Sequence, residues 1–186
     1  MKTLLLMRHA KSSWKHADLA DFERPLNKRG KKDAPAVGHW LKARNLVPDF
    51  ILSSSAVRAA QTAEAVAEAA GLDQHLVDFQ DQLYLAEADD YLTSLRELPD
   101  GINLAMVVGH NPGAESLLQI LSGKIEPLPT AVVAILALPV AHWADLSAET
   151  DGQLIDVLLP REIRKEEHDE KQKEKEKDKP KKKKGK

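Results

Sequence analysis

The chain has 186 residues, 42% of them hydrophobic, which is enough to bury the core of one domain. It contains no cysteine, so disulfide bonds, a thiolate nucleophile and a cysteine-ligated metal are excluded. The net charge of −2 conceals a division, because residues 161–186 hold 13 basic and 8 acidic residues and almost no apolar ones. Such a segment buries too little surface to offset its ordering entropy. We therefore predict one domain over residues 1–160 and a disordered, charged tail over residues 161–186.

The apolar run at the N-terminus ends at Arg8 and His9. It is too short for the apolar region of a secretion signal, and no later run approaches the length of a membrane span. We therefore expect a cytoplasmic protein without a membrane segment.

Apolar runs and helical patterns alternate along the rest of the chain. Runs without polar alternation are typical of strands that are covered on both faces. They predict strands over residues 2–8, 49–53, 76–79, 103–109, 131–138 and 153–159. The intervening segments predict helices over residues 31–44, 56–70, 87–98 and 113–122, with Asn111 as the N-cap of the last. This alternation predicts a three-layer α/β/α sandwich around a mainly parallel sheet.

Basic side chains follow three of the predicted strands at the point where each strand ends. Arg8 and His9 close the first strand, and Arg58 lies in the first turn of the helix after the second. His110 follows the fourth strand directly. Ligands of open α/β sheets bind outside the carboxyl ends of the strands. If these strands are neighbours, two histidines and two arginines meet at one edge of the sheet.

These residue types suit phosphoryl transfer. Arginine presents a rigid fork of donors that matches phosphate oxygens. A neutral imidazole is a nucleophile toward phosphorus, and nearby arginines disfavour its protonation. A second histidine, if protonated, can neutralise the equatorial oxygens. The remaining histidines lack the spacing of metal ligands, so we expect no metal and no cofactor; they are His16, His39, His75 and His142.

Three motifs now show a family resemblance. Residues 5–12 read Leu-Leu-Met-Arg-His-Ala-Lys-Ser, residues 54–63 read Ser-Ser-Ala-Val-Arg-Ala-Ala-Gln-Thr-Ala, and residues 108–113 read Val-Gly-His-Asn-Pro-Gly. In this order they resemble the signature of the histidine phosphatase superfamily, which has the phosphoglycerate-mutase-like fold. The Arg-Pro-Leu-Asn run from Arg24 and the small size resemble its SixA-like phosphohistidine phosphatase branch.

The resemblance implies a role for each matching residue. His9 would accept the phosphoryl group and form a transient phosphohistidine. Arg8, Arg58 and His110 would complete the phosphate pocket. The resemblance also places a phosphate-contacting serine at Ser12 and a further arginine at Arg24.

The general acid is not marked by a motif. Asp18, Asp21, Asp81 and Glu87 are candidates, and we favour Asp21 because it lies just before Arg24. An ion pair between Asp21 and Arg24 is the alternative. A phosphohistidine substrate would need little acid catalysis, because its leaving imidazole departs more easily than an alkoxide.

Three functions remain open. The first is a phosphatase acting on a histidine-containing phosphotransfer or phosphocarrier protein, through phospho-His9. The second is a phosphomonoesterase with the same mechanism acting on a sugar phosphate or nucleotide. The third is an inactive phosphate-binding module that recruits partners through its tail. Nucleic acid is not an expected partner, because glutamates are interspersed among the lysines of the tail.

Overall fold

The computed structural model describes residues 1–15 and 18–165. Its centre is a six-stranded sheet with the order β3-β2-β4-β1-β5-β6. Strands β3, β2, β4 and β1 are mutually parallel, whereas β5 and β6 are added through antiparallel pairs. The predicted mainly parallel sheet is confirmed. The strands are β1 (Lys2–Arg8), β2 (Phe50–Ser54), β3 (Val77–Gln80), β4 (Leu104–Gly109), β5 (Val133–Leu138) and β6 (Gln153–Leu158).

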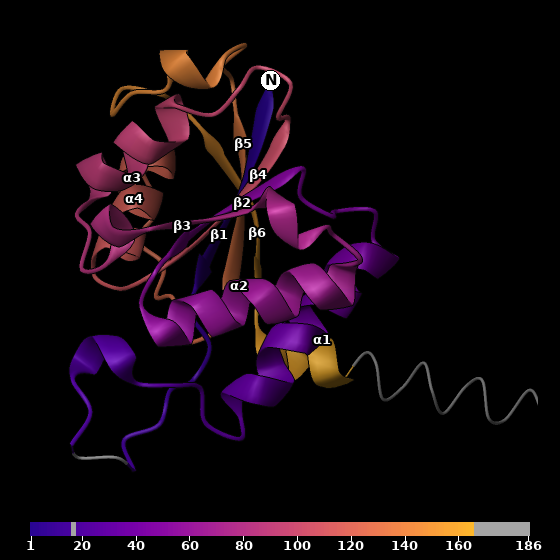
Figure 1. Cartoon of the computed structure of the whole chain (residues 1–186). Coiled ribbons are helices and arrows are strands. Elements are labelled where there is room, and N and C mark those ends of the chain that lie inside the picture. The colour runs from indigo at the N-terminus through magenta and orange to yellow at the C-terminus, as the bar shows by residue number, and fades with distance from the viewer. Residues whose placement is uncertain (16–17, 166–186) are drawn as a thin grey trace, which may run out of the picture.

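Helices cover both faces of the sheet and give the three predicted layers (Figure 1). Helices α1 and α2 lie on one face, and α3 and α4 lie on the other. None of the helices within the described ranges is long and apolar enough to span a bilayer. The helices are α1 (Gly30–Ala43), α2 (Val57–Ala70), α3 (Ala88–Arg96) and α4 (Gly113–Ser122).

The apolar run of β1 is explained by its position in the sheet. This strand lies between β4 and β5, and the side chains of Leu4, Leu5, Leu6 and Met7 are completely buried. Alternate residues of a strand point to opposite faces. Leu4 and Leu6 therefore enter the core under α3 and α4, while Leu5 and Met7 enter the core under α1 and α2.

The prediction that Asn111 caps α4 is wrong. The residue at the N-cap is Pro112, and no side chain bonds the first turn there. The Asn111 amide instead donates to the Glu115 carboxylate at 2.6 Å and to the Leu128 carbonyl at 3.0 Å. It thereby ties the start of α4 to the loop that precedes β5.

The folded part of the chain continues past the predicted boundary at residue 160. Residues 160–165 are helical, and the Ile163 side chain is buried against the core under α1. Arg164 forms an ion pair with Asp33, a completely buried carboxylate of α1. The predicted tail therefore begins as an ordered turn of helix, and its remainder, residues 166–186, lies outside the described residues.

The parallel strands bring the predicted site residues to one edge of the sheet. Arg8 pairs with Gly109 across the β1–β4 ladder, and Ser53 pairs with Val108 across the β2–β4 ladder. The carboxyl ends of β1, β2 and β4 therefore stop at the same level. The residues that follow them share one edge.

Gly109 occupies a position that has no room for a side chain. A Cβ atom there would lie 2.2 Å from the hydroxyl oxygen of Tyr91. That buried hydroxyl accepts the backbone N–H of His110 at 3.0 Å and donates to its carbonyl at 3.3 Å. Burial raises the pKa of Tyr91 to about 12, so the hydroxyl stays protonated. The glycine thus lets a tyrosine hold the backbone that carries His110.

We predict that Gly109→Ala lowers the free energy of unfolding by about 1–3 kcal/mol, because the added methyl group overpacks against Tyr91. Gly101→Ala is the matched control, since a Cβ there meets nothing within 4 Å. Urea denaturation of both variants and the wild type measures the difference. Equal stability of the two variants would contradict the close packing.

Candidate active site

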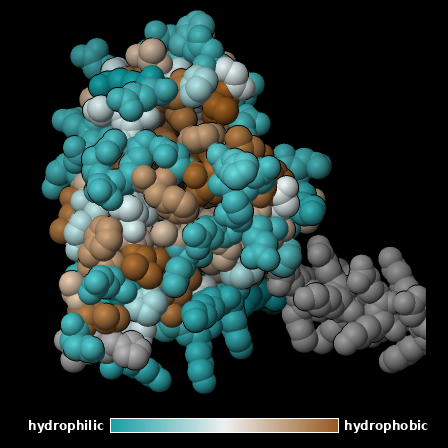
Figure 2. Space-filling view, viewed as in Figure 1, coloured by the Kyte–Doolittle hydropathy of each residue, from teal (hydrophilic) through white to brown (hydrophobic). Residues whose placement is uncertain are grey.

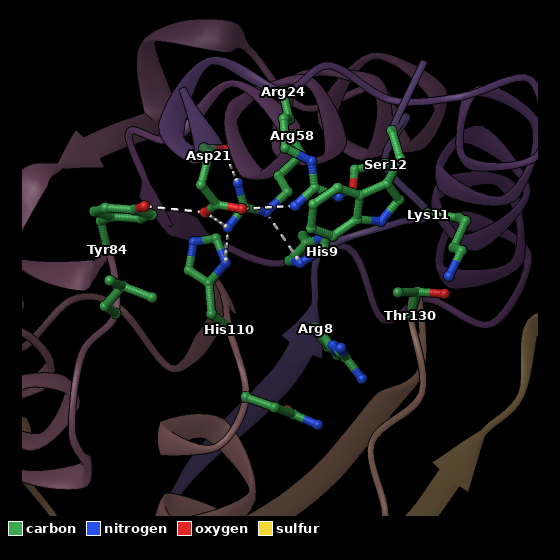
Figure 3. A pocket seen from close by; sticks show the side chains of 13 residues that line it. Arg8, His9, Lys11, Ser12, Asp21, Arg24, Arg58, Tyr84, His110 and Thr130 are labelled. Carbon is green, nitrogen blue, oxygen red and sulfur yellow. Dashed lines mark hydrogen bonds and ion pairs between the residues drawn. The ribbon is translucent and has the colours of Figure 1, made fainter. Parts of the chain in front are cut away.

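A hollow of about 540 Å³ opens at the carboxyl ends of β1, β2 and β4 (Figure 3). All seven site residues predicted from the sequence line it, although they come from distant parts of the chain. Two histidines and three arginines are among them, and Asp21 is the acidic residue. The lining residues are Arg8, His9, Lys11, Ser12, Trp14, Asp21, Arg24, Arg58, Tyr84, Leu85, His110, Asn111 and Thr130.

The His9 imidazole is held at both of its nitrogens. Nδ1 lies 2.8 Å from the Ala10 carbonyl oxygen, which can only accept, so Nδ1 carries the proton. Nε2 is then unprotonated, and the Nε–H of Arg58 donates to it at 3.3 Å. The lone pair of Nε2 therefore faces a guanidinium group in the hollow.

Burial and charge keep the His9 ring neutral. Desolvation is the main cause that lowers its pKa, and the positive charges of Arg58, Arg8 and Arg24 act in the same direction. The hydrogen bond to Ala10 opposes these effects only in part, and the pKa falls to about 4. At neutral pH the ring has the protonation state that a nucleophile needs.

His110 lies beside His9, with 5.0 Å between the ring centroids. Its Nδ1 accepts from Arg58 Nη2 at 3.3 Å, because arginine can only donate, and its Nε2 donates to Ser54 Oγ at 2.9 Å. Burial, the neighbouring His9 and Arg58 lower its pKa to about 3. Protonation of His110, which the sequence allowed, is therefore disfavoured, and the negative charge of a bound oxyanion would favour it.

Asp21 joins two of the three pocket arginines, Arg24 and Arg58, into one network. Its Oδ1 accepts from Arg24 at 2.6 Å, and its Oδ2 accepts from Arg58 at 2.9 Å and from the Tyr84 hydroxyl at 3.0 Å. The Asp21 carbonyl also accepts from Arg58 Nη1 at 2.6 Å. Figure 3 shows this carboxylate between the two guanidinium groups.

The surroundings of Asp21 oppose a role as proton donor. Partial burial tends to raise the pKa of this carboxyl, but hydrogen bonds from Arg24 and Tyr84 and the charge of Arg58 outweigh it. The net result is a pKa below the ordinary range, so Asp21 is ionised at neutral pH. The ion pair with Arg24, weighed as the alternative role, is present in the structure.

The other three candidate acids do not line the hollow. Asp81 accepts a hydrogen bond from the Ser55 hydroxyl at the start of the turn after β3. Glu87 is the N-cap of α3, and Asp18 is exposed. Geometry therefore leaves Asp21 as the one candidate acid within the described ranges that lies at the site.

The remaining predicted residues surround the same space. Arg24 Nη2 donates to Ser12 Oγ at 2.7 Å, and Arg24 Nε donates to the Ser13 carbonyl at 3.1 Å. Arg8 Nη1 donates to the Leu128 carbonyl at 3.0 Å, while its buried Nε has no hydrogen-bond partner among the described residues. A buried, unpaired donor is a cost that an anionic ligand can remove.

Two contacts in the site were not expected from the sequence. Thr62 Oγ1 accepts the backbone N–H of Ala10 at 3.0 Å and donates to the Arg58 carbonyl at 2.6 Å, so it connects the loop after β1 to α2. Thr62 lies four residues after Arg58 in the predicted helix, so the sequence alone places the two residues on the same helix face. Tyr84 follows β3, the fourth parallel strand. Because ligands of open α/β sheets bind outside the carboxyl ends of the strands, the sequence after β3 was also a place to look for site residues.

We find no group of three or more His, Asp or Glu side chains placed to hold a metal ion within residues 1–15 and 18–165. The hollow presents donors instead: guanidinium N–H groups, the hydroxyls of Ser12, Tyr84 and Thr130, and a lysine. Such a set complements an oxyanion rather than a cation.

The fold and this pocket define an α/β protein with an oxyanion site built from histidine and arginine. Residues 4–83 match the model of the histidine phosphatase superfamily, branch 1, and the chain belongs to this superfamily. Its fold is phosphoglycerate-mutase-like.

Similar proteins support this assignment. An uncharacterised chloroplastic protein of Arabidopsis thaliana is 35% identical over 156 residues, which are 79% of this chain and 71% of that protein. An uncharacterised protein of Mycobacterium tuberculosis is 32% identical over 151 residues, covering 75% and 91%. A crystal structure from Agrobacterium tumefaciens, provisionally described as phosphohistidine phosphatase SixA, is 30% identical with a TM-score of 0.71, covering 86% of this chain and 98% of that one.

We predict that the lowered pKa of His9 makes folding stability depend on pH. The unfolded chain takes up a proton on this ring near pH 6.5, whereas the folded protein resists it until about pH 4. Its contribution is complete above pH 6.5 and is lost as the pH falls through this window. When the pH is lowered from 6.5 to 4.5, the free energy of unfolding of His9→Gln should fall by about 2 kcal/mol less than that of the wild type. Urea unfolding at both pH values measures this, and parallel losses would contradict it.

Proposed function

We propose that the protein is a phosphohistidine phosphatase that acts through a phospho-His9 intermediate. The observation that carries the proposal is the Nε2 lone pair of His9, held beside Arg58 in a hollow rich in anion donors. Membership of the histidine phosphatase superfamily supports the same chemistry. The expected partner is a histidine-containing phosphotransfer or phosphocarrier protein.

The first step transfers the phosphoryl group to His9. Nε2 attacks phosphorus and forms a P–N bond, while the bond from phosphorus to the substrate imidazole breaks and its electron pair stays with that ring. Arg8, Arg58 and Arg24 would stabilise the phosphoryl oxygens, as a donor fork does for developing charge. The Nδ1–H bond to the Ala10 carbonyl stabilises the positive charge that develops on the His9 ring.

The second step restores the enzyme. A water oxygen attacks phosphorus, the bond between phosphorus and Nε2 breaks, and inorganic phosphate leaves with the water's oxygen and protons. His9 returns to its neutral, Nδ1-protonated form. Neither step needs an acid for a substrate ring that is protonated on its other nitrogen, because that ring leaves as neutral imidazole.

The rim of the hollow favours a protein substrate. Residues 71–103, between α2 and β4, form β3, α3 and short turns, and insert no domain over the site. The side chains of Trp14 and Leu85 line the hollow yet are 74% and 65% exposed. Leu85 also has a left-handed backbone with φ of 52°. Strain of this kind concentrates at functional sites, and the exposed apolar pair suits contact with another protein surface.

We predict that a reaction quenched within milliseconds carries an acid-labile adduct of about 80 Da, one phosphoryl group, on the peptide that contains His9. His9→Ala should abolish the adduct and reduce turnover of phosphohistidine more than a thousandfold. Mass spectrometry and phosphate release are the two measurements. A loss of less than tenfold would contradict nucleophilic catalysis by His9, and no turnover by the wild type would favour the inactive module.

A small phosphomonoester is the second candidate substrate. The observation in its favour is that the Asp21 carboxyl lies in the hollow, because an alkoxide leaving group needs an acid. We predict instead that Asp21 positions Arg24 and Arg58. Asp21→Asn should then change kcat/KM for p-nitrophenyl phosphate and for an alkyl phosphate by the same factor, within about threefold. General-acid catalysis would make the alkyl phosphate lose an additional hundredfold or more.

A further inference from the structure

A short β ribbon forms the wall of the phosphate pocket. Ser12 and Leu26 form an antiparallel bridge, and the Ser13 N–H donates to the Pro25 carbonyl at 2.8 Å. Successive residues of a strand point to opposite faces. Ser12 and Trp14 accordingly line the phosphate pocket, while Ser13 and Lys15 line a second hollow on the other side of the ribbon.

This second hollow has a volume of about 460 Å³ and a strongly basic lining. We call it the basic groove; its lining residues are Ser13, Lys15, Leu26, Asn27, Lys28, Arg29 and Lys31. Lys15, Lys28 and Lys31 are exposed. Among the residues that the structure describes, no acidic side chain lines the groove.

The lysines of the groove are not neutralised nearby. Arg29 is paired with the buried Asp33 at 3.1 Å, but Lys15, Lys28 and Lys31 form no ion pair within the described ranges. Lys31 also lines a neighbouring hollow, and Glu64 and Glu68 are among the other residues that line that one. Glu64 and Glu68 do not line the groove itself, so the charged side chains that line it are all basic.

The basic residues of the fold are concentrated in the N-terminal part of the chain, to which all residues of the groove belong. Residues 1–45 hold 11 of the 14 basic residues that precede residue 161, together with only 4 acidic residues. Residues 46–160 hold 3 basic and 17 acidic residues. Hydrophilic side chains project from the lower edge of the molecule, where α1 lies in Figure 1 (Figure 2). A basic area on an acidic protein steers acidic partners toward one face.

Trp14 lines the phosphate pocket, and its neighbours in the chain, Ser13 and Lys15, line the basic groove. Its indole ring is stacked on the Arg24 guanidinium, whose central carbon lies 3.2 Å from the ring centroid. Despite this contact, Trp14 is 74% exposed. A chain that crosses from the phosphate pocket to the groove would pass over this aromatic surface.

We propose that the basic groove binds an acidic segment of the protein substrate that flanks its phosphorylated histidine. This inference rests on the proposed function and adds where the substrate binds beyond its phosphoryl group. The two faces of a ribbon and their side chains span about 10 Å, which three or four extended residues cover. Acidic residues three and four positions from the phosphohistidine therefore reach the lysines.

The test uses the full chain and two synthetic phosphohistidine peptides. One carries glutamates three and four positions to each side of the phosphohistidine, and the other carries glutamines there. The wild type should prefer the glutamate peptide by about tenfold in kcat/KM at low salt, through KM, and this preference should shrink as salt screens the charges.

The variant Lys28→Glu/Lys31→Glu should lose this preference while keeping its kcat. Lys31 lies in the first turn of α1 and Lys28 in the turn just before it, where acidic residues are compatible with the helix dipole, so the fold should persist. Lys124→Glu is the matched control, because this exposed lysine follows α4 on the opposite face of the sheet. The control should keep the wild-type preference, and p-nitrophenyl phosphate hydrolysis should stay within twofold in both variants.

Several outcomes would overturn the proposal. Equal kcat/KM for both peptides in the wild type would remove the groove's role and leave the proposed function standing. Hydrolysis of p-nitrophenyl phosphate without release of phosphate from either peptide would refute the proposed function itself. A small bisphosphate serves as a further test substrate. If Lys28→Glu/Lys31→Glu lowers kcat/KM for this bisphosphate and for neither peptide, the groove is a second phosphate site of a small substrate.

Discussion

The chemistry of this site depends on the two hydrogen bonds that hold the His9 imidazole. The Ala10 carbonyl takes the proton of Nδ1, and this forces the lone pair onto Nε2, where Arg58 meets it. Burial then makes protonation costly. Tautomer, orientation and charge state of the ring are thus decided before any substrate arrives, which is what preorganised catalysis requires.

The arginines around this ring create a second constraint, because like charges in one hollow repel each other. Asp21 relieves it by accepting from Arg24 and Arg58 together. The Tyr84 hydroxyl completes the carboxylate's partners and holds its pKa low. The acidic residue at the site therefore serves the placement of positive charge. Arg8 and Lys11 add positive charge that Asp21 does not pair, and more lies on the neighbouring basic groove.

Much of the fold could be predicted from the pattern of residues. Continuous apolar runs identify β1 and β4 because central strands are buried on both faces, and the mainly parallel sheet follows from their alternation with helices. Because the carboxyl ends of parallel strands lie at one edge of the sheet, the sequence alone predicts that Arg8, Arg58 and His110 lie close together. Asn111 failed as a cap because α4 begins at Gly113, which makes Pro112 the N-cap, and the Asn111 amide donates to the distant Leu128 carbonyl.

The sequence by itself therefore determined the elements, the family and seven of the side chains that converge on the hollow. Only the tertiary structure decided their states: the tautomer of His9, the neutrality of His110 and the ionised, paired carboxylate of Asp21. It also revealed that the chain is ordered beyond residue 160, where Arg164 reaches a buried carboxylate. The physical reason is that periodicity reports burial along a strand or helix. Protonation and pairing depend on groups that meet across dozens of residues.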